Sequence, residues 1–182
     1  MESIFSLPYS EYEAIGRFSR ILKKRDGYSI FIPVSRQQQG CDFLIVGPRS
    51  RRTVRVQVKS SRGYQAKESP QHHFLFRNLA PRYRSGDADL YAFTCHYPIY
   101  ATGHSVRDPR RFWETTILVF TDEEIARLLP RIRSKSGKAD SFFTFGFDNE
   151  KKVMFTRGSL NGEPVTSYLL RNRVKELKGM LG

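Results

Sequence analysis

The sequence reads GCDFLIV over residues 40–46 and, after a polar turn, TVRVQVK over residues 53–59. The first run is apolar after Asp42 and the second alternates valines with polar residues, so the two runs predict a β-hairpin. Because strand side chains alternate between faces, Gln57 and Lys59 share one face and the intervening valines share the other. A closed hairpin places Asp42 near Gln57 and Lys59. The sequence therefore predicts a carboxylate, an amide oxygen and an ammonium in one small region, which is the start of a metal site.

The chain has a large excess of basic residues. Its 182 residues include 31 Lys and Arg against 18 Asp and Glu, a formal net charge of +13. Such an excess favours an anionic partner, either nucleic acid or a membrane surface. Nucleic acid fits better, because the basic residues occur along the whole chain rather than on one amphipathic helix. A generally basic surface without a specific partner is the alternative.

Length and composition predict one domain over residues 1–182, large enough to bury a substantial core. No apolar run approaches the ~20 residues that cross a bilayer, and the N-terminus lacks the pattern of a secretory signal. The two cysteines, Cys41 and Cys95, cannot make a disulfide-rich scaffold and belong to no zinc motif. We therefore expect a cytoplasmic protein with no membrane contact.

The first helix is predicted over residues 10–25. Its apolar residues recur at helical spacing, and Ser10 with Glu13 has the S-x-x-E pattern of a capping box, with Ser10 as the N-cap. Glu11 extends the apolar stripe by one turn, which puts a carboxylate on the core-facing side of the helix. The alternative is that Glu11 only favours the helix dipole, as most acidic residues of a first turn do.

Strands and helices follow one another along the rest of the chain. Strands are predicted at residues 28–34, 73–76, 89–95 and 116–120, a second hairpin at 142–147 and 152–156, and a polar excursion at 60–71. The run at 89–95 is apolar throughout, as in a strand buried on both faces. Thr121 and Glu124 form a capping box for a helix that Pro130 kinks or ends, and a last helix is predicted over 167–178. This order predicts an α/β or α+β sheet flanked by helices.

The hairpin resembles the catalytic core of the PD-(D/E)XK nuclease superfamily, which includes restriction endonucleases, Holliday-junction resolvases and certain homing endonucleases. The resemblance covers roughly the first third of the chain: a helix with an acid, a strand, Gly-x-Asp, a short hairpin and Gln-x-Lys. It departs from the family pattern at Cys41, where the family name has a proline, and at Gln57, where most members have an acid. The resemblance implies a restriction-endonuclease-like α/β fold, with a mixed central sheet flanked by helices.

In that family the matching residues form a metal-dependent active site, which implies catalytic roles for Glu11, Asp42, Gln57 and Lys59. Mg²⁺, with Mn²⁺ as a substitute, would be held by Asp42, the Gln57 side-chain oxygen, the Val58 backbone carbonyl and Glu11. The expected reaction is hydrolysis of a phosphodiester bond, in which Lys59 orients or deprotonates the attacking water or stabilises the charged phosphate. Because Gln57 is neutral, the anionic ligands must be Asp42 and Glu11.

Basic and polar residues around the hairpin are candidates for contact with nucleic acid. Arg36 with Gln37, Gln38 and Gln39 precedes Asp42, and such side chains can bind base edges, although a solvated loop explains them equally well. Phosphate contact is predicted for Arg49, Arg51, Arg52, Arg62 and Lys67, with stacking on Tyr64. The histidines, His72, His73, His96 and His104, match no zinc spacing and are interpreted as surface or core residues.

These observations favour a Mg²⁺-dependent DNA endonuclease that acts as a homo-oligomer, a dimer or a tetramer, since cutting two strands usually needs two sites. The main alternative is a catalytically inactive nucleic-acid-binding protein on the same fold. An RNA nuclease is a more distant alternative. No Walker loop, GxGxxG motif or nucleophilic Ser/Cys–His arrangement is visible in the sequence.

Overall fold

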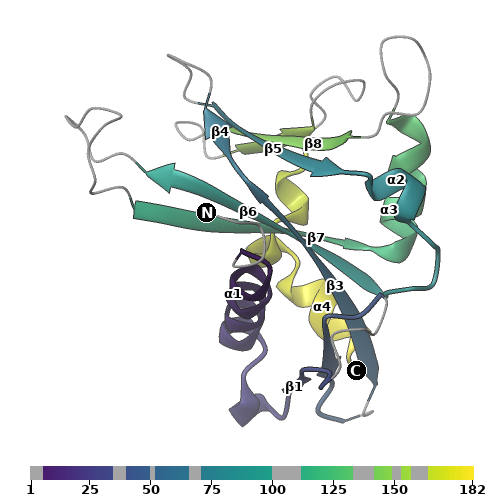
Figure 1. Cartoon of the computed structure of the whole chain (residues 1–182). Helices are drawn as coiled ribbons and strands as arrows, with labels where there is room; N and C mark the ends of the chain where they lie inside the picture. Colours follow the sequence, from purple (N-terminus) through teal and green to yellow (C-terminus); the bar gives the residue numbers. More distant parts are fainter. Residues whose placement is uncertain are drawn as a thin grey trace.

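The computed structural model describes residues 6–34, 40–49, 52–65, 71–99, 112–132, 142–148, 153–156 and 164–182. Within these ranges the strands form two sheets (Figure 1). The larger sheet has the order β1 (Ser29–Phe31), β2 (Phe43–Val46), β3 (Thr53–Arg62), β6 (Leu90–Ile99) and β7 (Phe112–Thr121). The smaller sheet has the order β4 (Tyr64–Gln65), β5 (Gln71–Arg77), β8 (Phe142–Asp148) and β9 (Val153–Thr156). The helices are α1 (Ser6–Ile21), α2 (Leu79–Arg82), α3 (Asp122–Leu128) and α4 (Val174–Met180).

The predicted hairpin is confirmed. β2 and β3 pair antiparallel, with Phe43 opposite Val56 and Val46 opposite Thr53. β3 then pairs with β6 in the parallel direction, with Gln57 opposite Tyr91 and Lys59 opposite Phe93. The other described pairings of the larger sheet are antiparallel, so the sheet is mixed.

One face of the larger sheet is covered by α1 and α4 (Figure 1). Ala14, Phe18 and Leu22 of α1 and Leu177 of α4 pack in one buried cluster with residues of β2, β3, β6 and β7. Burial of these apolar side chains stabilises the fold by roughly 25 cal/mol per Å² removed from water. On β3 the cluster takes Val54 and Val56, together with the half-buried Val58. The polar residues between these valines therefore face the other side of the sheet.

The second face of the larger sheet is covered mainly by the smaller sheet, together with α2 and α3. Phe93 of β6 lies at the centre, with its ring centroid 4.8 Å from that of Phe76, 5.6 Å from Phe145 and 5.3 Å from Phe143. Helices were predicted on the flanks of a single sheet. The structure confirms a mixed α/β chain with a helix-flanked sheet and adds a second sheet that the sequence did not predict.

The N-terminal helix begins earlier than predicted, at Ser6 rather than Ser10. The prediction that Ser10 is an N-cap is wrong, because Ser10 lies inside the helix and is 2% exposed. Its hydroxyl contacts the Nε2 atom of His96 at 3.0 Å, a partner far away in the sequence. Glu13 does not serve a capping box either, since its carboxylate accepts a hydrogen bond from Arg17 at 2.7 Å.

Residues 60–71 were predicted to form a polar excursion, and this prediction is wrong at both ends of the segment, where the structure has strands. β3 continues to Arg62, and the Gly63 N–H then donates to the His96 carbonyl at 2.6 Å. β4 and β5 follow as a pair of antiparallel strands, and residues 66–70 lie outside the described ranges. A Cβ atom at Gly63 would lie 2.8 Å from the Phe74 ring, so a glycine is needed where the chain passes from one sheet to the other.

The last helix is shorter than predicted. Residues 166–172 form two 3₁₀ turns, Thr166–Tyr168 and Leu170–Asn172, and α4 begins only at Val174. The buried Arg173 sets this boundary, since its guanidinium donates to Glu124 at 2.8 and 2.9 Å and to Glu176 at 2.7 Å.

The predicted strands differ mainly in length. The strand at 28–34 is reduced to Ser29–Phe31, whereas β6 and β7 are each longer than predicted. The predicted hairpin near the C-terminal third is confirmed as β8 and β9. The capping box is also confirmed: the Glu124 N–H donates to the Thr121 hydroxyl at 3.2 Å, and the Thr121 N–H to the Glu124 carboxylate at 2.8 Å. α3 ends at Leu128, before a 3₁₀ turn that contains Pro130.

Candidate active site

Asp42 lies at the open end of the hairpin, as predicted. Its N–H donates to the Val56 carbonyl at 2.9 Å, which continues the β2–β3 ladder by one residue. Its carboxylate Oδ2 accepts a hydrogen bond from the Val58 N–H at 2.5 Å. One carboxylate oxygen is therefore held against β3, next to Gln57.

Asp42, Gln57, Val58 and Lys59 all line one groove of about 850 Å³. The groove lies between β3 and the layer formed by β5 and α2, and its wall also contains the loop that follows α2. The structure thus brings together the three side chains that the hairpin pattern predicted to meet. Within the described part of the chain, the Gln57 and Lys59 side chains have no hydrogen-bond or ion-pair partner.

Burial changes the proton affinity of both charged groups in the groove. Desolvation raises the pKa of the Asp42 carboxyl, and the Val58 N–H and the Lys59 charge offset this only in part. Desolvation lowers the pKa of Lys59, and the positive charge of Arg82 lowers it further, whereas Asp42 opposes the change. Each group therefore gains from a charged ligand, because a cation would stabilise the Asp42 carboxylate and an anion the Lys59 ammonium.

The structure does not bring Glu11 to this groove. Glu11 is half-buried on α1, which packs through Ala14 and Phe18 against the opposite face of the sheet. It is not among the residues that line the groove. A metal bound in the groove would therefore rely on donors other than the helix carboxylate.

The predicted nucleic-acid contacts are only partly described. Arg49 and Arg52 are exposed at the turn between β2 and β3, and Arg62 is exposed at the end of β3. Residues 36–39, Arg51 and Lys67 lie outside the described ranges. The Tyr64 backbone forms part of β4.

Four charged residues of the groove were missed at the sequence level: Arg77, Arg82, Arg84 and Asp87. Arg77 ends β5, and the other three come from α2 and the loop after it. A signal was available, because Arg82-Tyr83-Arg84 joins basic and aromatic residues just before the buried strand β6. These arginines add positive charge to the wall that faces Gln57 and Lys59.

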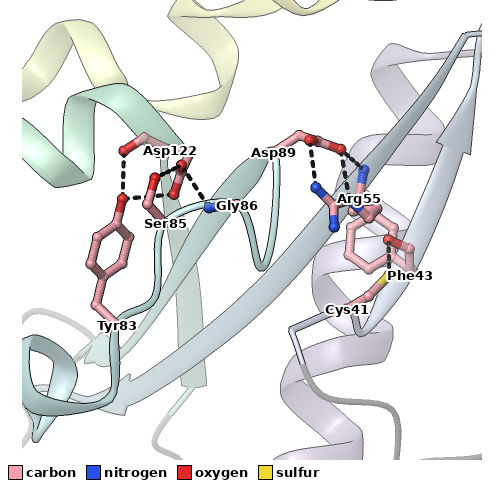
Figure 2. Close-up of polar contacts among 8 residues, drawn as sticks. All are labelled: Cys41, Phe43, Arg55, Tyr83, Ser85, Gly86, Asp89 and Asp122. Carbon is pink, nitrogen blue, oxygen red and sulfur yellow. Dashed lines mark hydrogen bonds and ion pairs between the residues drawn. The ribbon is translucent and has the colours of Figure 1, made fainter.

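The loop after α2 is held in place by two carboxylates (Figure 2). Asp122 accepts hydrogen bonds from the Tyr83 hydroxyl at 2.8 Å, the Ser85 hydroxyl at 2.9 Å and the Gly86 N–H at 3.0 Å. Asp89 accepts hydrogen bonds from the Arg55 N–H at 2.7 Å and from its guanidinium at 3.0 and 3.3 Å. The segment between these anchors therefore has a defined position beside the groove.

A Ser–His contact exists in the fold although the sequence pattern showed none. The His96 Nε2 atom contacts the Ser10 hydroxyl at 3.0 Å, and its Nδ1 atom contacts the Thr115 hydroxyl at 2.8 Å. Ser10 and His96 are 2% and 7% exposed, so a substrate cannot reach them. His72 and His73 are also buried, which agrees with the core interpretation, and His104 lies outside the described residues.

The groove offers oxygen donors, which suit Mg²⁺ rather than a soft metal. Its carboxylates are Asp42 and Asp87, and Gln57 adds an amide oxygen. Among the described residues, no three or more His, Cys, Asp or Glu side chains cluster in a way that could hold a metal. A hard cation held by these oxygens would therefore need water for the rest of its coordination.

Comparison with known proteins adds no relative. A scan against protein-family models found no match, and searches of curated proteins and of solved structures found no significant match. In the described part of the chain, no helix has the length and apolar character needed to span a membrane.

Proposed function

We propose that this protein is a Mg²⁺-dependent DNA endonuclease that hydrolyses phosphodiester bonds. The observation that carries the proposal is the meeting of Asp42, Gln57 and Lys59 in one groove, with a wall that also contains three arginines. The net charge of +13 supports a polyanionic substrate.

The fold supports the same proposal at a coarser level. A helix packs on a hairpin whose second strand pairs in parallel with β6, an arrangement compatible with a divergent restriction-endonuclease-like core. Both cysteines are free thiols, which fits a reducing compartment, and we propose a cytoplasmic location. We also propose a homo-oligomer, a dimer or a tetramer, because one groove provides one site for one strand.

The side chains of the groove have separate roles in this proposal. Asp42 and the Gln57 amide oxygen would hold Mg²⁺, with Mn²⁺ as a substitute. When bound, the metal supplies charge neutralisation at the scissile phosphate and lowers the pKa of water. Lys59 would orient that water or take up its proton, and its lowered pKa makes the neutral amine that proton uptake requires more accessible. Arg82, whose charge acts on Lys59, binds a phosphate oxygen.

The direct test is cutting of nucleic acid by the full chain. Supercoiled plasmid, branched DNA and RNA are incubated with Mg²⁺, Mn²⁺ or EDTA, and the products are separated on gels. We expect metal-dependent cutting of DNA that Asp42→Asn and Lys59→Ala abolish. Asp26→Asn and Lys23→Ala are matched controls, because both residues are exposed and belong to the turn after α1. Cutting that survives in Asp42→Asn and Lys59→Ala would refute the assignment of the site.

A second candidate is a catalytically inactive nucleic-acid-binding protein on the same fold. Two observations favour it: Gln57 is neutral, and one oxygen of Asp42 is already bonded to the Val58 N–H. Both reduce the charge available to a metal. Salt-sensitive DNA binding without cutting of any substrate would support the binding protein over the enzyme. Cutting of RNA but not of DNA would show that the substrate is RNA.

A further inference from the structure

A second pocket of the molecule lies at the outer edge of β7, the last strand of the larger sheet. It has a volume of about 470 Å³ and shares no lining residue with the groove. Residues of α1, of β7 and of the 3₁₀ turn Leu170–Asn172 line it, and three of them are arginines: Arg17, Arg20 and Arg171. We call it the arginine pocket. Its apolar lining is Ile21, Ile117, Phe147, Leu169 and Leu170.

Arg17 is oriented by a neighbour on its own helix. Its Nε–H donates to the Glu13 carboxylate at 2.7 Å, one turn earlier. Its side chain is 39% exposed, and its two terminal amino groups make no hydrogen bond to the described residues. Arg20 follows one turn later on the same side of α1. An arginine held through Nε presents its terminal amino groups to a ligand, and these groups suit the oxygens of an anion.

Arg171 extends from a segment with a fixed backbone. Leu169 forms an isolated bridge with Leu118 of β7, and the Asn172 N–H donates to the Leu169 carbonyl at 2.7 Å. Leu169 is buried, whereas the side chain of Arg171 is exposed. The guanidinium of Arg171 is therefore carried by an anchored turn beside the edge of the sheet.

Arg20 and Arg171 carry charges that the fold does not use. Within the described ranges, neither guanidinium makes a hydrogen bond or an ion pair. Arg55 and Arg173 differ in this respect, because they donate to carboxylates at 3.0 and 2.8 Å and so stabilise the packing of their segments. The arginines of the pocket therefore have donors available for a ligand.

The charges of Arg17 and Arg171 act at the same place in the pocket. Tyr97 lines it, and the Tyr97 hydroxyl donates to the Glu114 carboxylate at 2.8 Å. Burial and Glu114 raise the pKa of the Tyr97 hydroxyl, whereas the charges of Arg17 and Arg171 lower it, so both guanidiniums are near this hydroxyl. The described lining has three arginines against the one carboxylate of Glu114, which leaves an excess of positive charge.

We propose that the arginine pocket binds a phosphate group through Arg17 and Arg171, at a site separate from the groove. Guanidinium groups bind phosphate oxygens through paired, charge-assisted hydrogen bonds. The phosphate can belong to a free nucleotide, whose base would contact the apolar lining, or to a nucleic-acid strand. The inference goes beyond the proposed function and does not depend on it, because phosphate binding here requires neither a metal nor cutting.

The test measures binding to the full chain in EDTA at constant ionic strength. Titration calorimetry measures binding of pyrophosphate, ATP and citrate, and fluorescence anisotropy measures binding of a labelled DNA duplex. We expect Arg17→Ala combined with Arg171→Ala to weaken binding of the phosphate ligand about 10- to 100-fold, since loss of one hydrogen bond between charged groups costs about 10-fold. Arg25→Ala, an exposed arginine in the turn after α1, is the control. Circular dichroism melting curves check that each variant is folded.

A variant of opposite sign tests the position of the site. Glu114→Gln removes the carboxylate of the pocket and is expected to strengthen phosphate binding severalfold. Glu123→Gln, the same change at an exposed residue of α3, is expected to have a smaller effect.

The outcomes separate the two sources of phosphate. A loss of pyrophosphate and ATP binding in the double variant would identify a free nucleotide, and a loss of duplex binding alone would identify a nucleic-acid strand. Double-variant affinities equal to those of Arg25→Ala for every probe would overturn the site, and so would a wild-type chain that binds none of them. Citrate bound at least as tightly as pyrophosphate and ATP would overturn the assignment of phosphate. None of these results depends on whether the groove cuts DNA.

Discussion

Two groups of polar side chains, one on each face of the larger sheet, differ in their partners. On the face covered by α1, the His96 ring bridges two hydroxyls, those of Ser10 and Thr115, and all three groups are bonded. On the groove face, the Gln57 and Lys59 side chains make no hydrogen bond and no ion pair in the described part of the chain. Buried polar groups that serve the fold are hydrogen-bonded, since an unpaired one is costly. Polar groups in a groove that make no hydrogen bond within the protein are therefore candidates for binding a ligand.

Lys59→Ala is expected to have the largest effect, and on activity alone. The cutting rate per folded molecule should fall about 100- to 1,000-fold, as with loss of a group that stabilises charge in the transition state. Stability should not fall, because burial of this ammonium is unfavourable, as its lowered pKa indicates. Single-turnover cleavage and thermal melting measure the two effects, with Lys23→Ala as control. A lower melting temperature with normal cutting would make Lys59 a structural residue like His96.

Ser10→Ala is expected to show the reverse pattern. It leaves the His96 Nε2 atom without its partner in a buried position, which should cost about 1–3 kcal/mol of stability. Cutting per folded molecule should be unchanged. Urea unfolding measures the loss, and Ser19→Ala is the matched control, because Ser19 is an exposed serine on the same helix. A loss of cutting at normal stability would show that the contact between Ser10 and His96 takes part in function, which would contradict the distinction between the two faces.

Arg82→Ala is expected to weaken DNA binding modestly. Loss of one phosphate contact should lower affinity severalfold and reduce the slope of log affinity against log salt by about 1. It should also raise the pKa of Lys59, since Arg82 contributes to lowering it. Fluorescence anisotropy over a salt series measures affinity, with Arg25→Ala as control. An unchanged salt slope would exclude Arg82 from the DNA contact.

The smallest expected effect concerns pH and the metal-free protein. Burial raises the pKa of Asp42 in the folded state, so the folded state binds more protons than the unfolded state. The free energy of unfolding therefore falls as the pH rises from the ordinary aspartate range through the raised pKa. Asp42→Asn removes this loss, so its stability advantage over the wild type should grow with pH across that window. Urea unfolding in EDTA at a series of pH values measures it, with Asp26→Asn as control. A variant that becomes less stable than the wild type as pH rises would contradict the sign.

The parts predicted from sequence are those in which local pattern and tertiary contact agree. The hairpin was predictable because the valines of β3 alternate with polar residues and the core takes those valines. The capping box at Thr121 was predictable because both of its partners lie within three residues. The same pattern at Ser10 failed, because a buried histidine 86 residues away takes the hydroxyl.

The groove could be predicted only on its hairpin side. Asp42, Gln57 and Lys59 are related by strand register, which the sequence pattern contains. The opposite wall depends on the packing of β5 and α2 over the sheet and on the approach of Asp87 to Gly40. These contacts join segments far apart in the chain, and no local pattern specifies them. The prediction for Glu11 failed for a similar reason. The apolar stripe of the first helix predicted which side of the helix is buried, but it did not predict which face of the sheet the helix covers.

The alternation along β3 limits how this protein can change over generations. Val54, Val56 and Val58 pack with the helix-covered core, and Gln57 and Lys59 line the groove. A single inserted or deleted residue within the strand would exchange the two sets and send an amide and an ammonium into an apolar core. Lineages descended from this chain can therefore alter the groove by substitution, one side chain at a time, but they cannot shift its position along the strand by one residue and still fold.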